Sequence, residues 1–162
     1  MRPERQPQVK YQNSQEFIPF VPAHAEAVIR LWNAAAHSDY PLNERFLSYN
    51  LVASTGEVIE GQVAIHRGEV VGFVIVCALM DDPKRTLGWI SAIAVEPSLQ
   101  RRGIGTELLT WAEGWLKAKG CTRIRLGGNL RPFLPGLPYA MRDNSDFFEK
   151  HGYQSPPGQP YE

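Results

Sequence analysis

Apolar positions along the chain recur at two spacings, one typical of strands and the other of helices. Residues 61–80 predict a hairpin through "RGE", and its second strand is the long apolar run "VVGFVIVCALM". That run is too short to span a bilayer. Further strands are predicted within 16–22, where Pro19 favours an edge position, at 86–95 and at 122–128.

The helical period marks four segments of the chain. The first, "PAHAEAVIRLWNAAA", places four apolar residues on one face, which are Ala27, Val28, Leu31 and Trp32. A second helix is expected from about Asn43, whose side chain suits an N-cap. The third, 103–120, carries a stripe of Ile104, Leu108, Ala112 and Trp115, widened by Leu109 and Leu116. Gly120 favours its end, and "SDFFEKHGY" predicts a short last helix.

The resulting order is strand, two helices, three strands, helix, strand, helix. It predicts a mixed α/β fold on one sheet, in which the strands flanking the long helix are parallel and joined by a right-handed crossover. A length of 162 residues fits one domain, and no internal repeat is present. We expect a flexible polar tail at 1–14 and a single domain at 15–162.

Composition restricts the partners and the compartment. The 17 basic and 17 acidic residues cancel, so no basic field favours nucleic acid or a membrane surface. The N-terminus lacks the apolar core of a signal peptide. The two cysteines and four histidines show no metal-ligand spacing, so no metal is expected. These features favour a cytoplasmic protein.

The stretch "VEPSLQRRGIGTELL" at 95–109 joins a predicted strand to the long helix. The first N–H groups of a helix have no internal partner and carry the positive end of its dipole. Gly103 and Gly105 lack Cβ atoms and let an anion approach the backbone, while Arg101 and Arg102 add positive charge. The residues alone are compatible with a pyrophosphate site or with a basic turn. The P-loop lysine and the third glycine of the dinucleotide motif are absent.

Two motifs resemble those of the GNAT superfamily of acyl-CoA-dependent N-acyltransferases. Gln100, Gly103 and Gly105 match the core of its cofactor motif, Gln/Arg-x-x-Gly-x-Gly/Ala, and "FFEKHGY" is similar to its Phe-Tyr-Glu-Lys-x-Gly-Phe signature. The element order agrees with the family from about Glu16 to Tyr153. The resemblance implies the GNAT fold, with helices on both faces of a mixed sheet. It also implies acetyl transfer from acetyl-CoA to a primary amine of a small molecule or peptide by direct attack.

The resemblance also implies a cofactor site. Backbone N–H groups of the loop would hold the pyrophosphate, and the end of the fourth strand would separate from its neighbour and pair with the pantetheine arm. The residues implied are Ile93, Ala94, Val95, Gln100, Arg101, Arg102, Gly103, Ile104, Gly105 and Thr106. A backbone N–H near 93–95 would polarise the thioester carbonyl.

The sequence departs from the family in its catalytic groups. The tyrosine that protonates the leaving thiolate in the family corresponds to Phe148, which has no proton to donate. Tyr139 and Tyr153 are close in sequence, with Tyr139 the weak candidate for the role. The strand at 86–95 contains no carboxylate to act as a base, and Glu96 follows it in a turn. The catalytic residues therefore stay unassigned.

Acceptor contacts are expected from the first helical region and from the connection "GGNLRPFLPGLPYAMRDN". We expect Asp39 and Tyr40 to contact the acceptor, with Arg131 binding a carboxylate and Phe133 an apolar group. An alternative for the connection is a structural lid with an exposed arginine. Trp32 is expected in the core.

The chain ends in "YQSPPGQPYE", whose prolines oppose the closing strands that GNAT domains usually have. The expected fold therefore has short or missing closing strands, as a truncated domain or one half of a tandem GNAT protein would. A second copy or a second GNAT domain is the expected partner. Two functions remain open: an active N-acetyltransferase, or a catalytically silent acyl-CoA-binding or structural domain.

Overall fold

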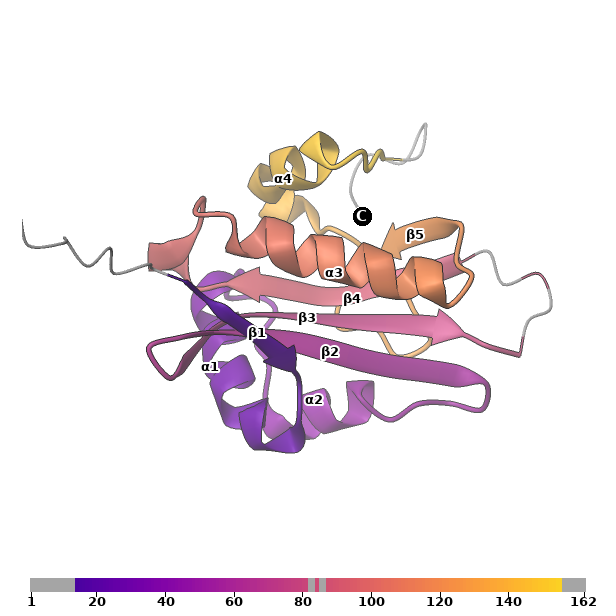
Figure 1. Ribbon diagram of the computed structural model, residues 1–162, viewed down its shortest axis with the longest axis horizontal. Coiled ribbons are helices and arrows are strands. Elements are labelled where there is room, and N and C mark those ends of the chain that lie inside the picture. The colour runs from indigo at the N-terminus through magenta and orange to yellow at the C-terminus, as the bar shows by residue number, and fades with distance from the viewer. Residues whose placement is uncertain (1–13, 82–83, 85–86, 156–162) are drawn as a thin grey trace, which may run out of the picture.

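In the described part of the chain, five strands form one mixed sheet and keep their chain order across it (Figure 1). They are β1 (Glu16–Pro19), β2 (Glu57–His66), β3 (Glu69–Leu79), β4 (Leu87–Val95) and β5 (Arg123–Leu126). Neighbouring strands are antiparallel except β4 and β5, which are parallel. This computed structural model describes residues 14–81, 84 and 87–155.

Helices cover both faces of the sheet (Figure 1). The helices α1 (Ala25–Ala35) and α2 (Glu44–Asn50) lie on one face and α3 (Ile104–Ala118) lies on the other, while α4 (Ser145–Lys150) follows the connection after β5. The described residues also form the short 3-10 helices η1 (Pro22–His24), η2 (Pro97–Leu99) and η3 (Tyr139–Asn144). The element order predicted from the sequence and the mixed α/β fold are confirmed.

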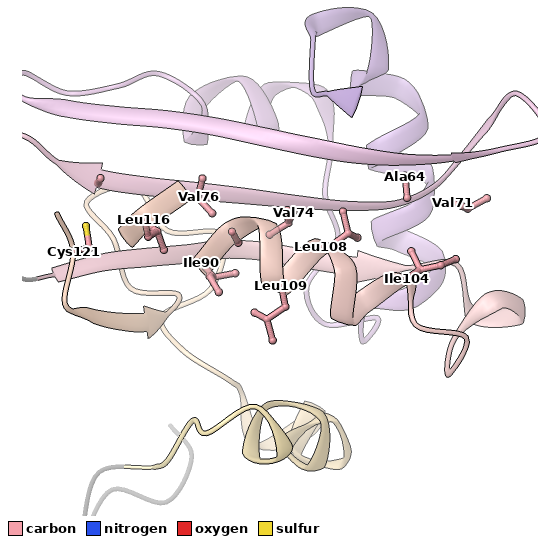
Figure 2. Close-up of a cluster of buried hydrophobic side chains, with 12 residues drawn as sticks. Ala64, Val71, Val74, Val76, Ile90, Ile104, Leu108, Leu109, Leu116 and Cys121 are labelled. Atoms are coloured by element: carbon pink, nitrogen blue, oxygen red, sulfur yellow. The ribbon is translucent and has the colours of Figure 1, made fainter. Parts of the chain in front are cut away.

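Two cores lie on the two faces of β3, which explains its almost uninterrupted apolar sequence. Val74 and Val76 face α3, whereas Phe73 and Ile75 face α1. Figure 2 shows Leu108 and Leu116 of α3 within the first cluster. The predicted stripe of α3 is confirmed for five residues, which are Ile104, Leu108, Leu109, Ala112 and Leu116. Trp115 is only partly buried, and its indole N–H donates to Glu60 Oε2 at 3.0 Å.

Local signals in the sequence set the ends of these elements. Asn43 Oδ1 accepts a hydrogen bond from the Phe46 N–H at 2.8 Å, so the predicted N-cap of α2 is confirmed. Arg67 and Gly68, with φ of 52° and 80°, make the two-residue turn of the β2–β3 hairpin. Gly120, with φ of 89°, ends α3 in the left-handed conformation that glycine adopts without strain.

The two ends of the chain are only partly described. The predicted tail at 1–14 lies outside the described residues except for Ser14, and the described part ends at Ser155. Within it, no strand follows α4. The prediction about closing strands concerns residues 153–162, most of which the structure does not describe. No helix in the described ranges is long and apolar enough to cross a bilayer.

Candidate functional site

A groove of about 480 Å³ runs along the free edge of β4 and between α3 and α4. Residues 90–95 of β4 line it, as do most of the Gln100–Thr106 loop, the end of β5, the connection after it, and α4. Its apolar lining residues include Ile90, Leu126 and Leu134. Arg101, Asp143, Asp146 and Lys150 are the charged members of the lining among the described residues.

The groove exists because β4 and β5 separate halfway along β4. Their ladder ends at the pair Ile90 and Leu126, where the Gly127 N–H donates to the Ile90 carbonyl oxygen at 2.8 Å. Beyond that pair, residues 92–95 remain paired with β3 on one side, and the described chain supplies no strand on the other. An extended ligand with amide groups can pair with this free edge as an added strand does.

A β-bulge lies at the point where the strands separate. Ile75 of β3 faces Ala92 and Val76 faces Ile90, so Ser91 is the extra residue. Ser91 is 4% exposed and lines the groove, and its Oγ has no hydrogen-bond partner among the described residues. Sequence reasoning missed Ser91, although a lone polar residue within an apolar strand was the available signal.

The loop between β4 and α3 presents backbone N–H groups to the groove. The first hydrogen bond within α3 joins the Glu107 N–H to the Gly103 carbonyl oxygen at 3.0 Å, so the three preceding amides come before the intrahelical ladder. Gly103 has φ of 90° and offers no side chain to cap them. Gln100 Nε2 donates to the Val95 carbonyl oxygen at 3.1 Å, which fixes the loop to the end of β4.

Helix α4 packs against the same loop. A Cβ placed on Gly105 would lie 3.3 Å from two ring atoms of Phe147, so the missing side chain permits this contact. A Cβ placed on Gly103 would meet nothing within 4 Å. The two glycines of the motif thus have different roles: Gly105 lets the two helices approach, and Gly103 provides the left-handed turn beside open space.

Most residues implied as cofactor contacts line this groove. Those that do are Ile93, Ala94, Val95, Gln100, Arg101, Gly103, Gly105 and Thr106. Arg102 is exposed and does not line it. Ile104 has a side chain only 1% exposed in the α3 core, so any contribution from it comes from its backbone.

Phe148 lines the groove, and its ring stacks edge-on against Phe147 and Tyr153 with centroid distances of 5.1 and 6.0 Å. The side chain of Tyr139 lies outside what the structure describes. Tyr153 does not line the groove: its hydroxyl donates to Glu113 Oε1 at 2.9 Å. Burial, followed by this hydrogen bond to a carboxylate, raises the pKa of Tyr153 well above its usual range, so its proton is held firmly.

A smaller recess of about 230 Å³ adjoins the groove, since Trp32 lines both. Asp39, Tyr40 and Phe133, three of the predicted acceptor residues, line this recess together with Phe46. Trp32 is 4% exposed, as its predicted core position requires, and its indole N–H donates to the Tyr40 carbonyl oxygen at 2.8 Å.

The structure places Arg131 away from the recess. Its guanidinium lies 5.1 Å from the centroid of the Tyr49 ring, and Nη1 donates to the Val52 carbonyl oxygen at 3.0 Å. These contacts connect the segment after β5 with the end of α2, and the expected carboxylate-binding role of Arg131 stays a prediction. Asn50 adds to these contacts, because its Nδ2 donates to the carbonyl oxygens of Arg131 and Pro132.

His151, which sequence reasoning also missed, lines the groove at the C-terminal end of α4. Its ring lies against Phe147 at a centroid distance of 4.8 Å, and Nδ1 lies 2.7 Å from the Phe147 carbonyl oxygen. The i, i+3 spacing from Phe148 to His151 was a readable signal that both residues share one side of the helix. In the described ranges, no group of three or more potential ligand residues converges on a metal position.

Comparisons with known proteins agree with this geometry. A family model described as "Acetyltransferase (GNAT) family" matches residues 25–131, which is more than half of the chain. A solved structure of a GCN5-related glucosamine N-acetyltransferase region, from a fungal multi-domain GH3 β-N-acetylglucosaminidase, is 26% identical with a TM-score of 0.81. The match covers 90% of this chain and 18% of the fungal chain, so this chain spans less than a fifth of that protein.

Two further solved structures share the fold at lower identity. The ribosomal-protein-S18-alanine N-acetyltransferase of Escherichia coli is 16% identical with a TM-score of 0.66, over 88% of this chain and 79% of its own. A tandem GNAT protein of the clavulanic acid biosynthesis pathway is 20% identical with a TM-score of 0.57, over 70% of this chain and 36% of its own. No curated protein sequence matches this chain.

Proposed function

The chain belongs to the acetyltransferase (GNAT) family, and from that premise we propose that it transfers an acetyl group from acetyl-CoA to the primary amine of a small molecule. The observation that carries the proposal is the free edge of β4, which leads directly into the glycine loop at the start of α3. One end of this groove suits an extended chain with amides, and the other suits an anion.

The dimensions and chemistry of the groove fit acetyl-CoA. Residues 91–95 span about 13 Å at roughly 3.3 Å per residue, which suits the extended pantetheine arm. The amides of Ile104, Gly105 and Thr106, with Arg101 beside them, provide donors and positive charge for the pyrophosphate. The acyl group then lies near the bulge at Ser91, where the surroundings are apolar.

The reaction proposed is direct attack of the amine nitrogen on the thioester carbonyl carbon. The C–N bond forms, the C–S bond breaks, the amine loses one proton, and the departing thiolate takes up one. The groove contributes by holding the two reactants together. Phe148 cannot supply the proton to sulfur, so solvent or another group does, and we expect slower chemistry than a tyrosine would allow.

We propose an amino sugar as the acceptor class. The aromatic walls of the recess, Trp32, Phe46 and Phe133, suit the apolar face of a sugar ring. Asp39 at the exposed end can accept hydrogen bonds from hydroxyl groups. Support for this choice also comes from the fungal relative, which is described as a glucosamine N-acetyltransferase region.

A second candidate is a catalytically silent acyl-CoA-binding domain, within a larger or tandem protein. Two observations favour it: Phe148 lines the groove where the family has its acid, and β4 carries no carboxylate. The tandem GNAT protein provides a precedent for a fold repeated within one chain. Binding and turnover therefore need separate tests.

Cofactor binding is tested by thermal unfolding with and without acetyl-CoA. At about a hundredfold excess over the dissociation constant, binding adds roughly 2.7 kcal/mol, or about 5–10 °C for a chain of this size. Gly103→Val should abolish the shift by filling the open space of the anion site. Gly120→Val is the matched control, because it has the same left-handed φ and open surroundings at the other end of α3. Equal shifts in both variants would remove the pyrophosphate assignment.

Turnover is tested by following release of free thiol from acetyl-CoA with a panel of amines. Glucosamine should react, and N-acetylglucosamine, which has no free amine, should not. Reaction with amino acids but not with amino sugars would contradict the acceptor class. Binding of acetyl-CoA without thiol release from any amine would favour the silent domain.

A further inference from the structure

The imidazole of His151 is an ionisable group in the groove that the reaction described above does not use. The ring is partly buried and packs at a tilt against Phe147, with 4.8 Å between centroids. Phe147 in turn contacts the position where a Cβ of Gly105 would lie, at 3.3 Å. The Phe147 ring thus lies between His151 and the start of α3, and His151 and Gly105 both line the groove.

The hydrogen bond of the ring fixes which nitrogen carries a proton. Nδ1 lies 2.7 Å from the Phe147 carbonyl oxygen, and a carbonyl oxygen can only accept. Nδ1 therefore donates, and Nε2 is the nitrogen that gains or loses a proton. No hydrogen bond from Nε2 to another described residue is present. In the neutral ring, Nε2 carries a lone pair that repels a phosphate oxygen; in the charged ring, it donates to one.

We propose that protonated His151 binds the pyrophosphate of coenzyme A, so that cofactor binding tightens as the pH falls through the range in which imidazole ionises. This inference rests on the proposed function and extends it, because it makes occupancy of the groove depend on pH. The backbone amides of the loop would hold the pyrophosphate at any pH, and His151 would add a charge-assisted hydrogen bond at low pH.

Linkage fixes the sign of the effect. A ligand that binds the protonated form better raises the pKa of that group, so affinity rises as the pH falls through the range between the two pKa values and is greatest below both. A rise of about one pKa unit on binding corresponds to about tenfold tighter binding at low pH than at high pH. The charged neighbours that line the groove are Arg101, Asp143, Asp146 and Lys150, and none belongs to a residue type that ordinarily changes charge between pH 5.5 and 8.

Dephospho-CoA is the probe for this proposal, since it keeps the pyrophosphate but lacks the 3′-phosphate, which itself titrates near pH 6. Calorimetric titration should give a dissociation constant about tenfold lower at pH 5.5 than at pH 8. His151→Gln should bind with the same affinity at both pH values, because its amide does not ionise. His66→Gln, a change at a histidine of β2 that does not line the groove, should keep the full pH dependence.

A second measurement uses the imidazole itself and requires no turnover. At pH 7, the NMR signal of the His151 ring Cε1–H should move toward its position at pH 5.5 when dephospho-CoA is added. An unmoved signal, or equal pH dependence of binding in His151→Gln and the unaltered protein, would overturn the proposal. Absence of any binding by CoA and dephospho-CoA at either pH would instead overturn the proposed function and this inference with it, so the two failures are distinguishable.

Discussion

At the level of single residues, Phe148 lines the groove at the position where the family resemblance places a tyrosine. It lines the groove from α4 and lies between the rings of Phe147 and Tyr153. Phe148→Tyr adds one hydroxyl to the para carbon without otherwise changing the ring. If the thiolate lacks a proton donor, the new hydroxyl should raise kcat by about tenfold or more, since general acids contribute roughly 10²–10⁴. Thiol release over pH 6–9 measures this, and a new alkaline limb in the profile would report the phenol.

The control for this change is Phe20→Tyr, which makes the same alteration at a ring that does not line the groove. Its kcat should match that of the unaltered protein. A folded Phe148→Tyr variant with unchanged kcat and unchanged pH profile would mean that protonation of the thiolate does not limit turnover.

Residue positions within one motif were predictable, whereas contacts between motifs were not. The sequence match placed Phe148 at the tyrosine position, and the structure finds its ring in the groove. His151 belongs to the same motif, but its nearness to the glycine loop depends on how α4 packs on Gly105. Arg131 shows the converse: its charge suggested a ligand, yet a carbonyl group and the Tyr49 ring hold it.

At the level of elements, one glycine within α3 and one just after its end have open surroundings and different backbone conformations. Gly114 lies within the helix, and Gly120 follows its end with φ of 89°. A Cβ would meet nothing within 4 Å at either position. Gly114→Ala should therefore raise the free energy of unfolding by up to about 1 kcal/mol. Gly120→Ala should lower it by roughly 1 kcal/mol, because alanine is strained in the left-handed region.

Urea denaturation measures the free energy of unfolding of both variants, and each variant is the control for the other. Neither residue lines the groove, so acetyl-CoA should shift both melting temperatures equally. If both substitutions lower the free energy of unfolding, the prediction for Gly114→Ala is wrong and its added methyl group is not accommodated.

The elements themselves were predictable because each carries its own periodicity and its own end signals, such as Asn43 and Gly120. The bulge in β4 was not predictable in the same way. An extra residue inserted into a strand buried on both faces leaves the apolar pattern almost unchanged, since Ile90, Ala92 and Ile93 are apolar in either register. Only the pairing with β3 shows that Ser91 is the inserted residue, and therefore where the free edge begins.

At the level of the whole molecule, the sheet has a continuous half and a divided half. The strands β1, β2 and β3 are paired along their length, whereas β4 continues five residues past its last partner on β5. The core under α3 and the core under α1 hold β4 from both faces. The strand β4 can therefore keep its place in the sheet although one of its edges is unpaired. The groove is thus a preformed feature of the fold.

Hydrogen exchange can test whether acetyl-CoA binds along the unpaired edge of β4. Acetyl-CoA at about a hundredfold excess over its dissociation constant should slow exchange in residues 91–95, in the Gln100–Thr106 loop and in α4 by up to about a hundredfold. Amides pairing β1 with β2 should be unaffected, because that half of the sheet is already closed. Peptide-resolved mass spectrometry measures both regions in one experiment, and Gly103→Val should lose the protection in all three segments. Protection centred instead on Tyr40 and Phe133 would place the cofactor in the recess, and the assignment of groove and recess would have to be exchanged.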